Sequence, residues 1–218
     1  MKNAPGVLYV VATPIGNLED ITSRALRVLK EADVVACENV AQTRKLLSHF
    51  DIHTPAISDR KALPLLGQGK RVALVSDAGT PGVSDPGGEL VAAARELGVK
   101  IEVVPGPSAL AAALSIAGVR APQFVFYGFL PQKKGREKLF AEIAKESRAA
   151  VFYESPHRIM KALQSLQKAA PERRVGLYRE MTKLYEEALI GTPQELLNML
   201  ESDPQKQKGE FVVIVEGL

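Results

Sequence analysis

Two segments in the second half of the sequence place carboxylates beside basic side chains, a combination that can take up a proton or stabilise a developing negative charge. The segment FYESPHR contains Glu154 and Arg158. The segment REMTK contains Glu180 and Lys183. Each segment completes an apolar run typical of a β-strand, so all four side chains are expected at the carboxyl ends of strands. They are candidate catalytic residues, with surface or interdomain salt bridges as the alternative for each.

A second group of candidates lies in three loops that are rich in glycine and proline. The loops ATPIGN, SDAGTPGVSDPG and VPGPSAL each follow an apolar run. Glycine lets a ligand approach the backbone closely, and proline holds a loop in one conformation, so less entropy is lost on binding. In an open parallel sheet such loops meet at the carboxyl ends of the strands, where ligands bind. The alternative is that the glycines and prolines only end the strands. This would explain a single loop of this kind, but it is a weaker explanation for three such loops at one edge of a sheet.

The first half of the chain alternates short apolar runs with helix-periodic segments, which predicts an α/β fold with a mostly parallel sheet. The expected strands cover residues 6–12, 33–37, 71–75 and 101–105. The expected helices cover residues 21–32, 43–50 and 88–98, and an alanine-rich helix follows Pro107. Thr13, Asp20 and Ser108 stand where helix N-caps are expected.

The pattern changes at residues 121–135, where prolines, aromatic residues and basic residues replace the alternation. We place a domain junction there and predict two α/β domains, residues 1–119 and 120–218. In the second domain, strands are expected at residues 149–154, 175–180 and 210–217, and helices at 136–147, from 155 onward and at 192–202. The last strands are expected to be antiparallel, which makes the second sheet mixed.

The composition limits the class of protein. A chain of 218 residues with 46% apolar residues is long enough for a large core. Its single cysteine, Cys37, favours a reducing compartment, and no export signal or membrane-length apolar stretch is recognisable, so a cytoplasmic protein is expected. The net charge of +3 is small for a nucleic-acid-binding protein.

Common cofactor and metal motifs are missing from the sequence. There is no GxGxxG at a strand-to-helix turn, no GxxxxGK[ST], no HExxH and no CxxC. The three histidines, His49, His53 and His157, are scattered, so no metal site is predicted. A nucleotide-like ligand would therefore need a different backbone cradle.

A basic cluster and two aromatic residues follow the predicted junction. The segment QKKGREK is either a solvated loop with a helix start or a patch for RNA phosphates. Tyr127 and Phe129, just before it, either stack on an extruded base or pack at the junction. The basic residues of this segment are Lys133, Lys134, Arg136 and Lys138.

Seven motifs in this order and spacing resemble the ribosomal RNA small subunit methyltransferase I family of the tetrapyrrole methylase superfamily. They are TPIGNLEDIT, SDAGTPGVSDPG, VPGPSAL, GFLP, FYESPHR, REMTK and KGEFVVIVEG. The resemblance spans nearly the whole chain. It implies two α/β domains with S-adenosylmethionine in the cleft between them, a homodimer, and methyl transfer to the 2′-hydroxyl of a cytidine in the decoding region of 16S rRNA, as free RNA or in the small ribosomal subunit.

The resemblance also implies which residues contact the cofactor. Thr80 stands where many relatives have Asp, and Glu154 falls where the second domain closes on the methionine moiety. Asp77 and Asp85 are expected either to shape their loop or to contact the ligand. The positions that match the family's cofactor loops are Pro14, Gly79, Thr80, Pro81, Val83, Ser108 and Ala109.

Two segments depart from the family pattern. Relatives usually show Glu-Asp-Thr-Arg after the second strand, where this chain reads CENVA at residues 37–41. The following segment, AISDRKALP, is shorter than the His- and Asn-rich stretch of relatives. These departures leave two further hypotheses open: a methyltransferase acting on a tetrapyrrole or another small molecule, and an inactive relative that binds cofactor or RNA.

Overall fold

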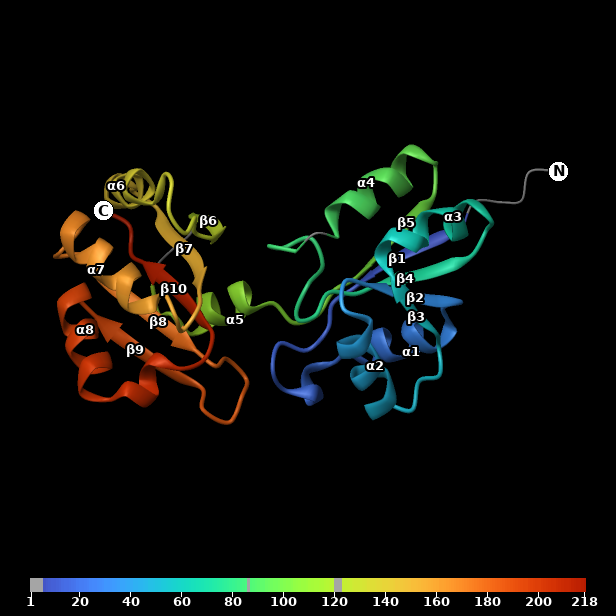
Figure 1. Cartoon of the computed structure of the whole chain (residues 1–218), viewed down its shortest axis with the longest axis horizontal. Coiled ribbons are helices and arrows are strands. Elements are labelled where there is room, and N and C mark those ends of the chain that lie inside the picture. Colours follow the sequence, from blue (N-terminus) through green and yellow to red (C-terminus); the bar gives the residue numbers. More distant parts are fainter. Residues whose placement is uncertain (1–5, 86, 120–122) are drawn as a thin grey trace. The chain divides into compact units, whose positions relative to one another are not determined.

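The computed structural model describes residues 6–85, 87–119 and 123–218, and the chain divides into two compact units, Met1–Ser108 and Ala109–Leu218 (Figure 1). The junction predicted from the sequence lies after residue 119. The difference lies in residues 109–119, which contain helix α5 (Ala109–Ile116) and belong to the second unit.

The first unit contains a five-stranded sheet in the order β3-β2-β4-β1-β5. All strand pairs of this sheet are parallel, as predicted. Four of its strands were expected from the sequence, and the three-residue β3 was not. The strands are β1 (Val7–Val11), β2 (Val34–Cys37), β3 (Ala56–Ser58), β4 (Arg71–Leu74) and β5 (Lys100–Val104).

Helices cover both faces of this sheet (Figure 1). On one face, Leu29 of α1 (Ser23–Glu31) and Leu47 of α2 (Val40–His49) pack in a cluster with Val11 of β1. On the other, Leu66 of α3 (Ala62–Gly67) and Leu90 of α4 (Gly88–Glu96) pack in a cluster with Leu8. Leu8 and Val11 are three positions apart on β1, so their side chains point to opposite faces. Short 3-10 segments, η1 (Leu18–Asp20) and η2 (Asp59–Lys61), precede α1 and α3.

The helix caps differ from the sequence expectation. Thr22 caps α1 by accepting a hydrogen bond from the Ala25 amide at 3.0 Å. Thr13 is buried and caps no helix, because its hydroxyl bonds the glycine loop described below. Asp20 ends the segment η1, two residues before Thr22, the N-cap of α1. The N-cap predictions at Thr13 and Asp20 were therefore wrong.

The second unit is built on a mixed sheet in the order β6-β7-β10-β8-β9. β6 and β7 are parallel, and the other three strand pairs are antiparallel, which confirms the mixed sheet. β7, β8 and β10 were predicted, whereas β6 falls in the segment interpreted as a junction. The strands are β6 (Phe124–Phe129), β7 (Ala149–Glu154), β8 (Val175–Arg179), β9 (Glu187–Gly191) and β10 (Phe211–Val215).

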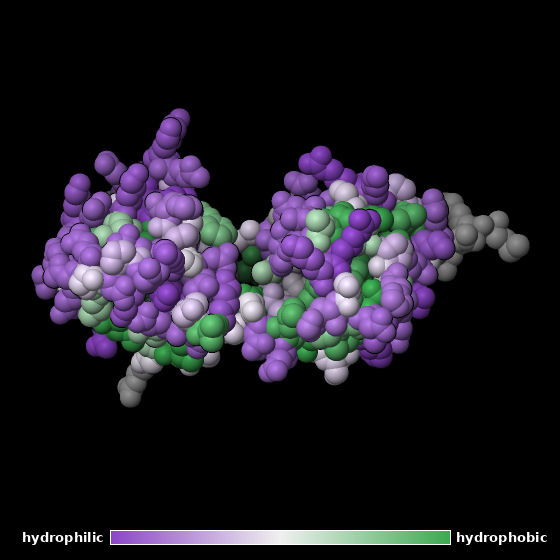
Figure 2. All heavy atoms as spheres, turned by 60° about the horizontal axis from the view of Figure 1, so that its bottom comes forward, coloured by the Kyte–Doolittle hydropathy of each residue, from purple (hydrophilic) through white to green (hydrophobic). Residues whose placement is uncertain are grey.

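Three helices cover one face of this sheet: α6 (Arg136–Lys145), α7 (Ile159–Ala169) and α8 (Pro193–Ser202). They share a core with the sheet that includes Phe140, Leu163, Leu196, Phe152 and Val213. A 3-10 segment, η3 (Pro204–Gln207), leads from α8 to β10, and α5 lies on the opposite side of the sheet (Figure 1). Within each unit, the face seen in Figure 2 is largely hydrophilic, with separate small hydrophobic patches. Among the described helices, none has the length and apolarity to cross a membrane.

A tight ion pair after α6 makes a pH-dependent contribution to stability. The Glu146 carboxylate accepts hydrogen bonds from Arg148 Nε and NH2, both at 2.8 Å, and from the Arg148 amide at 3.0 Å. These bonds lower the pKa of Glu146 from 4.5 to about 2. Because the folded-state pKa is depressed, the stabilisation is fully present above about pH 4.5 and is lost as the pH falls toward 2.

We expect Glu146→Gln to lower the free energy of unfolding at pH 7 and to have progressively less effect between pH 4.5 and 2. Urea denaturation at a series of pH values measures this difference. Glu142→Gln is the control, because its partner Lys138 lies at 3.9 Å on the exposed surface. A Glu146→Gln effect that stays constant across this pH range would contradict the assignment.

Candidate functional site

The sheet of the first unit has a topological switch point between β1 and β4. These strands are parallel neighbours, yet α1, which follows β1, and α4, which follows β4, pack on opposite faces. The loops that follow β1 and β4 therefore turn toward opposite faces of the sheet, which leaves a crevice between them at the carboxyl ends of these strands. Ligands of open α/β sheets bind at such a crevice. Two of the glycine- and proline-rich loops from the sequence analysis begin there.

The first two loops are bound to each other. The Thr13 amide donates to the Gly79 carbonyl at 2.9 Å, and the Gly79 amide donates to the Thr13 carbonyl at 3.0 Å. The Thr13 hydroxyl donates to the Ser76 carbonyl at 3.3 Å, and the Ser76 hydroxyl donates to the Gly79 carbonyl at 3.2 Å. This double bridge fixes the position of Gly79, which adopts a positive φ of 83°.

The third loop joins the same structure. The Thr80 hydroxyl donates to the Pro107 carbonyl at 3.0 Å, so the loop after β4 is attached to the loop after β5. Pro14 and Pro81 are buried, and Val83 is half-buried. Ser108 and Ala109, both half-buried, stand where the chain passes into α5. The structure thus ties together the three loops that the sequence analysis selected.

The crevice edge carries negative charge. Burial raises the pKa of Asp85, and the neighbouring carboxylates of Glu38 and Asp77 raise it further, although the Ser76 hydroxyl opposes this. Asp85 borders a cavity of about 10 Å³ together with Glu38 and Asp59, and no basic residue of the described chain lines it. Asp77 is exposed. An acidic edge of this kind favours a ligand with net positive charge.

This arrangement fits S-adenosylmethionine. The cofactor carries a sulfonium, an ammonium and one carboxylate, so its net charge complements the acidic edge. Gly79 allows the second loop to lie close to the first, since a Cβ at this position would lie 3.3 Å from Ile15 Cγ2. At Gly106 a Cβ would lie 3.1 Å from Ala12 Cβ, so the third loop is also tightly packed. Among the residues that the structure describes, no group of three His, Cys, Asp or Glu could hold a metal ion.

The candidate catalytic segments meet at one edge of the second sheet. Phe211, the first residue of β10, pairs with Glu154 at the end of β7 and with Arg179 at the end of β8. Glu154 and Arg179 are therefore two strand spacings apart, about 10 Å. Glu180 follows Arg179 directly, so FYESPHR and REMTK lie on the same edge as their sequence positions suggested.

Glu154 is a fully buried carboxylate held between two arginines. Its Oε1 lies 2.7 Å from Arg158 Nε and accepts a hydrogen bond from the Ser155 amide at 2.9 Å. Its Oε2 accepts a hydrogen bond from Arg136 NH2 at 3.3 Å. Arg158 also donates to the Leu130 carbonyl at 3.2 Å, and it is partly exposed. Both carboxylate oxygens are engaged, so the geometry assigns Glu154 to hold the two guanidinium groups in place.

Glu180 and Lys183 form a second cluster with Glu210. Lys183 Nζ lies 2.9 Å from Glu180 Oε1 and 3.0 Å from Glu210 Oε2. Burial alone would raise the pKa of Glu180, but the Glu210 amide and the Lys183 ammonium hold it below its ordinary value. Burial would likewise lower the pKa of Lys183, yet the two carboxylates hold it above its ordinary value. Lys183 therefore remains a cation, and Glu180 is a weak base.

The backbone of the REMTK loop is strained. Glu180 and Thr182 adopt positive φ values of 50° and 64°, which non-glycine residues rarely do. Gly209 has a φ of 93°, and a Cβ there would lie 2.5 Å from Glu180 Cγ. Such strain persists where the surrounding contacts hold a functional geometry.

Two arginines of this edge were not expected from the sequence. Arg136 was placed in the basic cluster, but the structure brings it to Glu154. Arg179 is buried and pairs with Glu187 at 3.2 Å, which also pairs with Lys206 at 2.8 Å. Their partners lie 8 to 18 positions away in the chain, so no local motif signals these contacts.

The aromatic candidates separate into two environments. Tyr127 packs against the core of the second unit, and burial raises the pKa of its hydroxyl. Phe129 is 57% exposed and packs edge-to-face on Tyr153, with ring centroids 5.4 Å apart. His157 is exposed. Of the two aromatic candidates, Phe129 is therefore the one whose ring remains accessible for stacking.

Comparisons with known proteins agree with the fold. The model of the family described as Tetrapyrrole (Corrin/Porphyrin) Methylases matches residues 7–197. Two crystal structures of uroporphyrin-III C-methyltransferase from Thermus thermophilus superpose with TM-scores of 0.68 and 0.64, at 21% and 23% identity. Each covers 97% of this chain, and the chain covers 97% and 94% of theirs. This likeness shows the shared fold.

Curated relatives define the family of this chain more narrowly. Three proteins named Ribosomal RNA small subunit methyltransferase I come from Coprothermobacter proteolyticus, Thermotoga maritima and Vibrio cholerae, and they are 46%, 42% and 47% identical to this chain. The alignments cover 96%, 97% and 100% of this chain, and 97%, 99% and 79% of the relatives. The chain therefore belongs to the tetrapyrrole methylase family, within the group of ribosomal RNA small subunit methyltransferase I proteins.

Proposed function

We propose that this protein is an S-adenosylmethionine-dependent methyltransferase of small-subunit ribosomal RNA, and that its acceptor is the ribose 2′-hydroxyl of a cytidine in 16S rRNA. The observation that supports it best is the identity of 42% and 46% along nearly the full length of two relatives that carry this name. We further propose that the protein acts in the cytoplasm as a homodimer.

The cofactor is assigned to the loops at the β1–β4 switch point. Their backbone N–H and C=O groups can bind the amino and carboxylate groups of S-adenosylmethionine, and the acidic edge suits its positive charge. When bound, the cofactor supplies an electrophilic methyl group on a sulfonium. The residues proposed to hold it are Pro14, Asp77, Gly79, Thr80, Pro81, Val83, Ser108 and Ala109.

The chain's own residues orient the acceptor. In methyl transfer the acceptor oxygen attacks in line, the bond to sulfur breaks as the bond to oxygen forms, and the hydroxyl proton passes to solvent water. We assign Arg158 and Lys183 as cations that stabilise the negative charge developing on the ribose oxygen and hold the adjacent phosphate. Glu154 and Glu180, engaged with these cations, are positioning residues in this proposal.

A methyl-transfer assay tests the function. Purified protein is incubated with tritiated S-adenosylmethionine and with 16S rRNA, small ribosomal subunits or uroporphyrinogen III in parallel. We expect label in RNA or subunits, at a cytidine that resists alkaline cleavage on its 3′ side. Label in the tetrapyrrole alone would replace the proposal by the small-molecule hypothesis. Cofactor binding without transfer to any acceptor would favour the inactive relative.

A further inference from the structure

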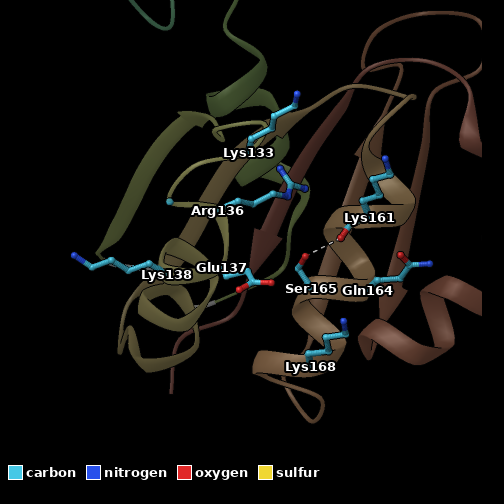
Figure 3. Close-up of a pocket in the computed structure, with 9 residues that line it drawn as sticks. Lys133, Arg136, Glu137, Lys138, Lys161, Gln164, Ser165 and Lys168 are labelled. Carbon is cyan, nitrogen blue, oxygen red and sulfur yellow. Dashed lines mark hydrogen bonds between the residues drawn. The ribbon is translucent and has the colours of Figure 1, made fainter.

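A basic groove lies between α6 and α7 of the second unit (Figure 3). Its volume is about 660 Å³, within the range of ligand-binding pockets. The α6–α7 groove is lined by Lys133, Gly135, Arg136, Glu137, Lys138, Lys161, Gln164, Ser165 and Lys168. Nothing in the proposed chemistry accounts for this groove, because Glu154 and Lys183 do not line it.

Helical periodicity builds the α7 wall. Lys161, Gln164, Ser165 and Lys168 follow one another at i, i+3, i+4 and i+7, so they share one face of α7. The opposite face packs into the core through residues such as Leu163. Seven residues correspond to about 10 Å along a helix axis, a length over which one strand of a duplex presents about three phosphates. Lys161 and Lys168 can therefore reach different phosphates.

The opposite wall comes from the loop before α6 and its first turn. Figure 3 shows Lys133 and Arg136 on the left side of the groove and Lys161 of α7 to their right. Arg136 is held in place by three contacts: Glu154 Oε2 at 3.3 Å, the Pro131 carbonyl at 3.1 Å, and the Phe140 ring, whose centroid lies 5.1 Å away. The buried carboxylate of Glu154 thus preorganises one cation of the groove.

The groove is strongly positive. Five of its residues are basic and one, Glu137, is acidic. Arg136 is paired with Glu154, and Lys138 lies 3.9 Å from Glu142. Within the described parts of the chain, Lys133, Lys161 and Lys168 form no ion pair with a carboxylate. Three lysines from both walls are therefore available to an anion.

We propose that the α6–α7 groove binds the phosphate backbone of the RNA substrate, away from the ribose that receives the methyl group. The inference rests on the proposed function for the identity of the RNA. The lining contains no aromatic side chain, so it lacks the rings on which successive bases of a single strand usually stack. Lysines that contact phosphates fix the position of an RNA without reading its sequence. The groove accordingly holds any strand of suitable length and places the acceptor region.

The test replaces two lysines of α7 and compares this double variant with one that lacks two lysines outside the groove. Lys161→Gln/Lys168→Gln is compared with Lys30→Gln/Lys145→Gln, which removes the same charge from exposed positions outside the groove. Fluorescence anisotropy measures binding of two labelled RNAs of equal length, the decoding-region sequence and oligouridine, at several salt concentrations. Loss of two phosphate contacts to a single strand should lower affinity about 25-fold at 0.1 M salt and reduce the salt slope by about 1.4.

The expected result is this loss for both RNAs in the groove variant and wild-type affinity in the matched control. S-adenosylmethionine affinity should be unchanged in both, and the KM for RNA should rise with kcat preserved. Equal affinities and slopes in the two double variants would overturn the proposal. The proposal would also be overturned if the groove variant lost affinity for assembled subunits but not for free RNA, because the partner of the groove would then be a ribosomal protein. Failure of the proposed methyltransferase function would give a different result from failure of the groove proposal. No methyl group would be transferred, but RNA binding would still depend on the two lysines.

Discussion

Replacing Gly79 with alanine is expected to lower the affinity for S-adenosylmethionine about 30-fold or more, which corresponds to about 2 kcal/mol of binding free energy. The new Cβ would lie 3.3 Å from Ile15 Cγ2 and 3.7 Å from the Pro107 carbonyl oxygen. Both neighbours belong to the other two cofactor loops, so relieving the contact moves the loops apart. The Thr13 bridge resists this movement because it holds Gly79 at both its amide and its carbonyl.

Gly82→Ala provides the matched control. Gly82 has a φ of 85°, close to the 83° of Gly79, but a Cβ there meets no atom within 4 Å. Both substitutions therefore carry the same left-handed strain, about 1–2 kcal/mol, and only one of them crowds the loops. Calorimetric titration should show the large loss for Gly79→Ala and near wild-type affinity for Gly82→Ala, while urea denaturation shows similar destabilisation. Equal cofactor affinities in the two variants would refute the cradle at Gly79.

The second large effect is expected at Glu154. Glu154→Ala should lower the free energy of unfolding of the second unit by about 2–4 kcal/mol, because two arginines would keep their charges without a partner. The side chain of Glu154 is fully buried, whereas those of Arg136 and Arg158 are 12% and 20% exposed, so solvent screens part of the cost. A loss of this size lowers the Tm by roughly 10 °C. Thermal unfolding followed by circular dichroism measures it.

Glu154→Gln separates a positioning role from catalysis. The amide keeps the shape but not the charge, so we expect partial destabilisation and a methyl-transfer rate within about tenfold of wild type, with an unchanged pH profile, at a temperature where the variant is folded. Glu31→Gln serves as the control, because that side chain is 53% exposed, it pairs with Arg27 on the surface of α1, and its removal should cost little. A hundredfold loss of rate with full stability and an altered pH profile would instead make Glu154 the base.

The strands that the sequence did not reveal share one property. β3, β6 and β9 each lie at an edge of their sheet, whereas β4, β7 and β10 lie inside. An interior strand is covered on both sides and reads as a continuous apolar run, as in FVVIV of β10, all of it buried. The edge strand β9, EALIG, has a single buried residue. Apolar patterning therefore identified all the interior strands and the edge strand β5, but it missed the edge strands β3, β6 and β9.

The loops of the candidate site were predictable, but their attachments were not. Glycine and proline after a strand mark a loop that can hold a ligand, and their local spacing is visible in the sequence. The bridge from Thr13 to Gly79 joins residues 66 positions apart, so only the sheet order brings them together. The same holds for Lys161 and Lys168, which become part of a basic groove only when α7 packs beside α6. The residue types of each loop or helix could be predicted from the sequence, whereas the residues that they contact depended on the topology of the fold.

The central place of β10 in its sheet affects how the protein emerges from the ribosome. All strands of the first unit end by Val104, so that unit can complete its sheet early. The second sheet must wait for β10, which comes last in the chain and joins β7 to β8. At about 5–20 residues per second, the chain from Arg179 at the end of β8 to Val215 at the end of β10 takes roughly 2 to 7 seconds to synthesise. During this interval β7 and β8 each present an unpaired edge, which makes the nascent second unit a target for chaperones and for misassociation.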